Sequence, residues 1–60
     1  MKVQDVSILI VDDVNALRIQ IRDLLKKVGF EKIFLAANGF DAQKILKEEQ
    51  IQLVLSLIHI

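Results

Sequence analysis

The stretch Ser-Ile-Leu-Ile-Val-Asp-Asp, residues 7–13, runs from a largely apolar segment directly into two adjacent carboxylates. The continuous apolar run Ser7–Val11, with its β-branched residues, is typical of a strand that is buried on both faces of a parallel sheet. Buried charge costs several kcal/mol unless it is paired or bound to a cation, and Asp12 and Asp13 also repel each other. The pair is therefore expected at the open carboxyl end of the strand, with a hard divalent cation such as Mg²⁺. The alternative is that one carboxylate only caps the following helix.

The rest of the chain alternates between helix and strand patterns. After Asn15, apolar residues recur at three- and four-residue steps, which predicts a helix that ends at Gly29. Either Asp13 or Asn15 is expected to cap its start. The remaining predicted elements are a strand over Ile33–Ala37, the turn pair Asn38-Gly39, a helix over Phe40–Glu48 and a strand over Ile51–Ile58.

This alternation predicts an α/β protein with a parallel sheet and right-handed crossovers. In such sheets, ligands bind beyond the carboxyl ends of the strands, where the strand order reverses. Asp12 and Asp13 end the first strand and should therefore lie in that crevice. The third strand is apolar and is expected to form an unprotected edge of the sheet.

Composition excludes several classes of function. Sixty residues make one small domain at most, and eight basic residues balance eight acidic ones, so no net field favours nucleic acid or an anionic membrane. The absence of cysteine excludes disulfides and thiolate metal sites. No apolar run approaches the ~20 residues that a membrane span requires. We expect a soluble, cytoplasmic chain that makes no direct contact with nucleic acid.

In order and spacing, these motifs resemble the receiver domain of bacterial response regulators, in the chemotaxis-type branch. The resemblance covers residues 8–54 and is carried by Ile10-Val11-Asp12-Asp13, Leu17-Arg18, Ile21-Arg22, Leu24-Leu25, Gly29-Phe30, Ala37-Asn38-Gly39, Asp41-Ala42 and Leu53-Val54. Each motif is weak alone, but their combination is specific. The resemblance implies a three-layer, doubly wound parallel sheet of the flavodoxin-like receiver type, of which this chain carries three strands and two helices.

The resemblance also implies a role in two-component phosphorelay signalling, as a magnesium-dependent phosphoacceptor rather than a turnover enzyme. A sensor histidine kinase would donate the phosphoryl group, and a downstream target protein or output domain would receive the signal. Asp13 would ligate Mg²⁺ directly, and Asp12 directly or through water. Arg18 and Arg22 are expected to be solvated on a helix face, with a kinase contact there as the alternative. Phe40 is expected to pack in the core or at its rim.

The end of the chain departs from the family pattern. The phosphoacceptor aspartate of the family falls at position 57, where this chain has Leu57. His59 stands where a backbone carbonyl normally completes the magnesium shell, but a lone histidine among apolar residues is not expected to be a ligand. The last six residues match one reading frame of the transposon end sequence used in tagmentation library adapters. We therefore interpret residues 1–54 as the N-terminal part of a receiver domain and residues 55–60 as an adapter-derived tail.

Two other interpretations remain. If Leu57 is native, the chain belongs to a pseudo-receiver that binds partner proteins without phosphorylation, because leucine offers no nucleophile. An enzyme on the same scaffold, such as a flavodoxin-like or phosphatase domain, is disfavoured. No glycine-rich phosphate loop follows the first strand, and no Asp-x-Asp nucleophile motif is present.

Overall fold

Strands and helices alternate along this computed structural model, which describes residues 2–57. The elements are a short 3₁₀ turn η1 (Val3–Asp5), β1 (Ser7–Val11), α1 (Asn15–Val28), β2 (Lys32–Ala36), α2 (Gly39–Glu48) and β3 (Leu53–Ser56). The predicted order is confirmed, and β1 has the predicted bounds. β2 and α2 each begin one residue earlier than predicted. β3 is shorter than the predicted Ile51–Ile58, whose last residue lies outside the described residues.

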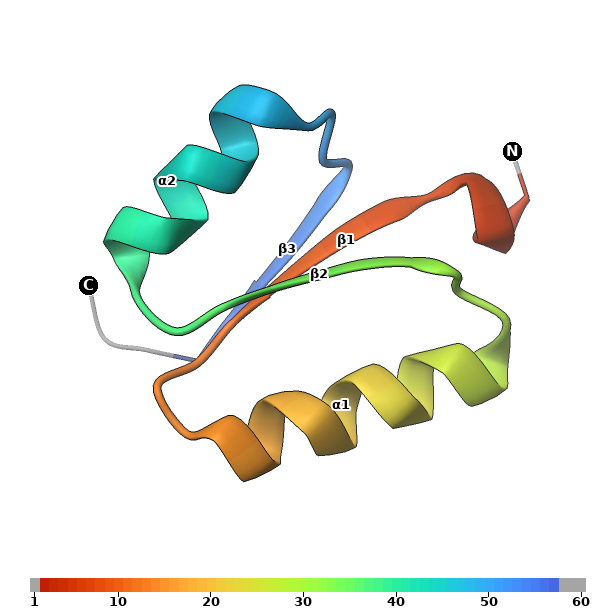
Figure 1. Cartoon of the computed structure of the whole chain (residues 1–60). Helices are drawn as coiled ribbons and strands as arrows, with labels where there is room; N and C mark the ends of the chain where they lie inside the picture. Colours follow the sequence, from red (N-terminus) through yellow and green to blue (C-terminus); the bar gives the residue numbers. More distant parts are fainter. Residues whose placement is uncertain (1, 58–60) are drawn as a thin grey trace.

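The sheet has β1 in its centre. This strand pairs in parallel with β2 on one side and β3 on the other, which gives the order β2-β1-β3. In Figure 1, α2 lies above the strands and α1 below them, so the two helices cover opposite faces. The arrangement is the first part of the doubly wound order 2-1-3-4-5, for which chemotaxis-type receivers are themselves a standard example. The predicted three-layer α/β architecture is therefore confirmed.

The central position of β1 explains its apolar composition. Ile8, Leu9 and Ile10 are 0% exposed, as expected for a strand with a neighbour on each side and a helix on each face. Leu9 belongs to the core cluster that includes Ala42 of α2, so this side of the strand faces α2. Because successive side chains alternate, Ile8 and Ile10 face the α1 side. The prediction of a strand buried on both faces is confirmed.

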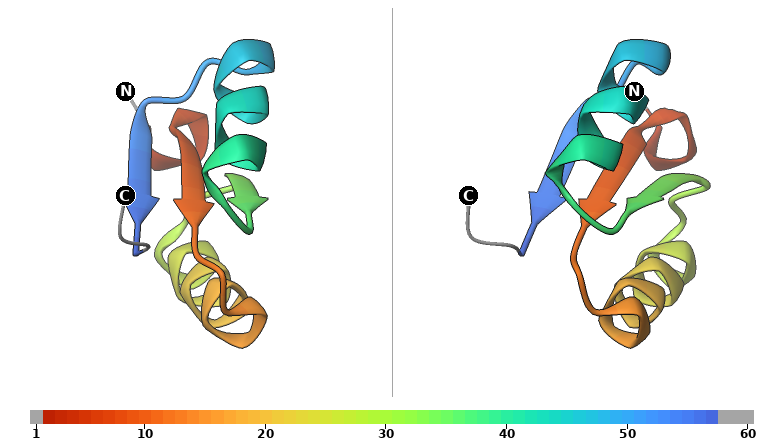
Figure 2. Two further views of the ribbon diagram at one scale, coloured as in Figure 1. Left: turned by 90° about the vertical axis from the view of Figure 1, so that its left-hand side faces the viewer. Right: turned by 60° about the vertical axis from the view of Figure 1, so that its left-hand side comes forward.

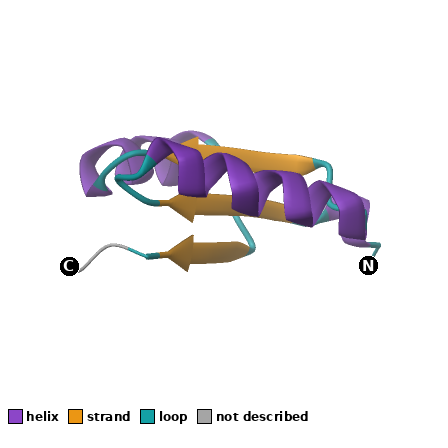
Figure 3. Ribbon diagram, turned by 90° about the horizontal axis from the view of Figure 1, so that it is seen from below, coloured by secondary structure: helices purple, strands orange, loops and turns teal. Residues whose placement is uncertain are grey.

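By contrast, β3 is an exposed edge. Its Leu53 and Val54 are 43% and 45% exposed. Figure 2 shows this strand at the outer side of the sheet, and in Figure 3 it lies beyond the part that α1 covers. Residues 51–57 contain no charged residue and no proline, which are the usual protections of an edge strand. The predicted unprotected apolar edge is confirmed.

The turn from α1 to β2 depends on Gly29. Its φ of 122° is the one positive value among the described residues, and its amide donates to the carbonyls of Leu25 and Lys26. A Cβ built on this residue would lie 3.1 Å from Cγ2 of Val3. The glycine is thus required both by the backbone conformation and by the close approach of the 3₁₀ turn.

Gly29→Ala should lower the free energy of unfolding by more than about 1 kcal/mol, because alanine is strained at this φ and crowds Val3. Gly39→Ala is the matched control. Gly39 begins α2 and has no positive φ, and a Cβ on it would meet no atom of another element within 4 Å. This second change should raise stability by about 0.4–1 kcal/mol. Urea denaturation of both variants checks the pair, and shifts of the same sign would contradict the account.

Candidate functional site

The carboxyl ends of the three strands meet at one edge of the sheet. The amide of Asp12 donates to the carbonyl of Ala36 at 3.1 Å, and the amide of Leu57 donates to the carbonyl of Val11 at 3.0 Å. These bonds continue the pairing of β1 with both neighbours by one residue. Position 57, which the family resemblance predicts to be the phosphoacceptor position, therefore lies directly beside the start of the acidic pair.

Asp12 is buried, with 3% of its surface exposed, and is the one buried charged residue in the part of the chain that the structure describes. Its Oδ1 accepts a hydrogen bond from the amide of Val14 at 2.8 Å. This contact closes a tight turn of the kind that aspartate side chains favour. It offsets part of the cost of burying the carboxylate.

The prediction that Asp13 or Asn15 caps α1 is wrong. Val14 occupies the N-cap position without a side-chain cap, and Asn15 is already inside the helix. The physical reason is the turn made by Asp12, which takes up the Val14 amide one residue before the helix begins. Asp13 therefore does not cap the helix. Asp12 accepts a hydrogen bond in the turn just before the helix, but it does not occupy the N-cap position.

Asp13 is exposed, so the pair combines one carboxylate held by the fold with one open to solvent. Carboxylate oxygens are the ligands that Mg²⁺ prefers, and one or two of them are usual in protein sites that retain water. The donor set therefore fits this ion. Within residues 2–57, no third acidic or histidine side chain joins the pair in a metal-binding cluster. Leu57 supplies no oxygen from its side chain, and His59 lies outside the described residues.

The two arginines of α1 behave differently from each other. Arg18 was predicted to be solvated, but its guanidinium folds back onto the loop, where Nη1 donates to the carbonyl of Asp12 at 2.6 Å and Nη2 to Oδ1 of Asn15 at 2.7 Å. Arg22 pairs with the neighbouring Asp23 at 3.0 Å. In the sequence, the sign of the contact between Arg18 and the Asp12 carbonyl is the spacing of six residues between them. Helical periodicity alone does not predict that contact.

Shortly after β2, Asn38 caps the second helix. Its Oδ1 accepts a hydrogen bond from the amide of Asp41 at 2.8 Å, which makes Asn38 the N-cap of α2. The predicted role of the Asn38-Gly39 pair in setting up this helix is confirmed. The prediction that Phe40 packs in the core or at its rim is wrong. This side chain is 68% exposed and lies with its ring centroid 5.0 Å from Nζ of Lys44.

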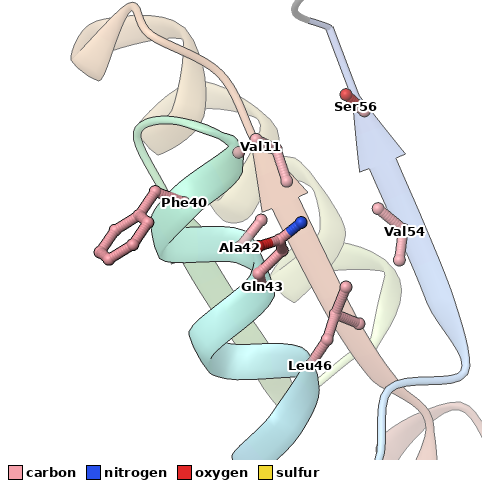
Figure 4. A pocket seen from close by; sticks show the side chains of 8 residues that line it. Val11, Phe40, Ala42, Gln43, Leu46, Val54 and Ser56 are labelled. Carbon is pink, nitrogen blue, oxygen red and sulfur yellow. The ribbon is translucent and has the colours of Figure 1, made fainter. Parts of the chain in front are cut away.

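A groove of about 400 Å³ lies between α2 and β3, on the α2 face of the sheet. Figure 4 shows Leu46 and Val54 on its two sides, with Val11 at its upper end and Phe40 directed away from it. The lining residues are Val11, Gly39, Phe40, Ala42, Gln43, Leu46, Val54 and Ser56. None of them is charged, so the side chains that line this groove offer no acid, base or carboxylate ligand.

The sequence is similar to that of a curated signalling protein. The chemotaxis protein CheY of Bacillus subtilis (strain 168) is 47% identical over 47 residues, which cover 78% of this chain and 39% of CheY. The chain therefore spans about two fifths of the length of this relative. No protein-family model and no solved structure gave a match. No helix within residues 2–57 is long and apolar enough to cross a membrane.

The match agrees with the fold in two respects. The parallel order β2-β1-β3 with a helix on each face is that of the first three strands of a receiver, and the acidic pair ends the central strand. The similarity covers most of the present chain rather than one short motif. Sequence similarity and fold together support a CheY-like receiver fragment.

Proposed function

We propose that the chain carries the metal-binding part of a receiver domain that accepts a phosphoryl group in two-component signalling. The observation that carries the proposal is the hydrogen bond from the Leu57 amide to the Val11 carbonyl. This bond sets position 57 beside Asp12 and Asp13. A phosphoacceptor at that position and a cation on the acidic pair would then lie at the same edge of the sheet.

Asp12 and Asp13 would have different roles in binding the metal. Asp12, held by the Val14 amide, would give a fixed anchor, and the exposed Asp13 would reach the ion directly. Bound Mg²⁺ would neutralise the charge of the phosphoryl group during transfer. Phosphoryl transfer requires positioning and charge neutralisation more than covalent help from the protein. A receiver of this kind acts as a phosphoacceptor switch and not as a turnover enzyme.

The chain as given cannot complete this reaction. Leu57 is 56% exposed, but its side chain has no nucleophilic atom. The proposal therefore assigns phosphorylation to a native sequence with aspartate at this position, in agreement with the reading of residues 55–60 as an adapter-derived tail. The partners would be a histidine kinase as donor and a target protein or output domain as receiver of the signal.

The second candidate is a phosphorylation-independent pseudo-receiver. It is favoured by one observation, the presence of leucine at the acceptor position. In that case the acidic pair would be a remnant, and the protein would act only by binding its partners. The two candidate functions differ in whether the carboxyl ends of the strands bind Mg²⁺ once an acidic residue occupies position 57.

Leu57→Asp should tighten Mg²⁺ binding by about tenfold or more, because it adds a carboxylate beside the existing pair and raises the charge of the site. Leu57→Asn is the matched control, since it has the same shape without the charge. The measurement is the Mg²⁺ dependence of the Asp13 and Val14 amide signals in NMR spectra, at concentrations where sedimentation shows a monomer. Equal affinities in the two variants would contradict the proposed site.

Substitutions of Asp12 should separate its structural role from its role toward the metal. Asp12→Asn keeps an oxygen that can accept the hydrogen bond from the Val14 amide. The free energy of unfolding should therefore change by less than about 0.5 kcal/mol, while Mg²⁺ binding weakens. Asp12→Ala removes the acceptor and should cost about 1–2 kcal/mol as well. Asp13→Asn should weaken Mg²⁺ binding alone, because Asp13 is exposed. Chemical denaturation and Mg²⁺ titration of the three variants test this, and unchanged Mg²⁺ affinity in both asparagine variants would refute the assignment.

A further inference from the structure

Arg18 stands in a position that local helix energetics disfavours. It is the fourth residue of α1, near the positive end of the helix dipole, where a cation is destabilising. The first turn of α1 contains no acidic residue, and its N-cap has no side-chain hydrogen bond. The dipole therefore does not favour an arginine here, and its two side-chain hydrogen bonds, one to Asn15 at the start of the helix and one to the Asp12 carbonyl before it, must account for it.

Those contacts join the two ends of the loop that carries the acidic pair. One arm of the guanidinium donates to the carbonyl of Asp12 and the other to the side chain of Asn15. Arginine suits this task because its planar group presents two donors in a fixed fork. The Asp12 carbonyl belongs to the peptide that leads to Asp13, so the bond restrains the direction in which Asp13 leaves the strand.

We propose that Arg18 is a positioning residue for the magnesium ligands. Besides the backbone pairing, two hydrogen bonds that involve side chains restrain Asp12: its Oδ1 accepts from the Val14 amide, and its carbonyl accepts from Arg18. Together they fix the side chain and the following peptide of the same residue. Arg18 bonds the backbone carbonyl of Asp12 and the side chain of Asn15, and within residues 2–57 it forms no ion pair with either carboxylate, so it would act on the metal through the orientation of the pair. The inference rests on the proposed magnesium function.

The competing effect has the opposite sign. A guanidinium close to a cation site also repels the cation, and if that repulsion dominated, removing Arg18 would tighten Mg²⁺ binding. If positioning dominates, removing it weakens binding, as the loss of groups that orient metal ligands usually does, by about 10–100-fold. The sign of the change thus distinguishes the two effects.

The experiment compares Arg18→Ala, Arg18→Lys and Arg22→Ala, each made in the Leu57→Asp chain, where the acidic site is most complete. Arg22 lies one turn further along α1, pairs with Asp23 and does not contact the loop, so it is the matched control. We expect Arg18→Ala to weaken Mg²⁺ binding about tenfold. Arg18→Lys should fall in between, because it keeps the charge but not the fork, and Arg22→Ala should bind as the parent does.

A second readout needs no metal. Hydrogen exchange at the Val14 amide should be faster in Arg18→Ala than in the parent and unchanged in Arg22→Ala, because only the first variant loses the bond that restrains the Asp12 carbonyl. Tighter Mg²⁺ binding by Arg18→Ala, or binding within twofold of the parent, would overturn the inference while leaving the proposed function intact. Absence of Mg²⁺ binding by the Leu57→Asp parent itself would instead overturn the proposed function.

Discussion

The structure depends on the parallel pairing of β1 with a strand on each side. This pairing buries Ile8, Leu9 and Ile10 completely, and these are the largest fully buried side chains of the described residues. The same register brings the ends of three strands to one edge, with Asp12 bonded to the end of β2 and Val11 bonded to position 57. The core and the candidate site therefore share one cause, because the strand that supplies the core also delivers the acidic pair to the edge.

The cost of that arrangement is a buried carboxylate. Asp12 follows four buried residues without a break, and no intervening turn carries it out to solvent. Local hydrogen bonds offset part of this cost: the Val14 amide donates to the side chain of Asp12, and Arg18 donates to its backbone carbonyl. The loop before α1 is consequently organised around Asp12 instead of around a capping residue, which leaves the helix itself with a poor amino-terminal cap.

The elements that sequence could predict are those with strong periodic patterns. The apolar run of β1, the helical stripe that ends at Gly29, and the Asn38-Gly39 turn before α2 each follow from local rules, and all three are present. The errors concern long polar or aromatic side chains at the surface. Arg18 folds back onto the loop and Phe40 turns outward beside Lys44. The orientation of each side chain depends on neighbours that no local sequence pattern specifies. The capping error at Asp13 arose because the Asp12 turn ends one residue before the helix.

The central claim is that the acidic pair serves a phosphoacceptor at position 57, and the most direct measurement is to amplify the source locus and sequence it through codon 54 and beyond. The account predicts an aspartate codon at position 57, followed by further strand and helix units, with the adapter match absent from the genome. A leucine codon at position 57 within a continuous genomic reading frame would contradict it, and the phosphorylation-independent binding module would take its place.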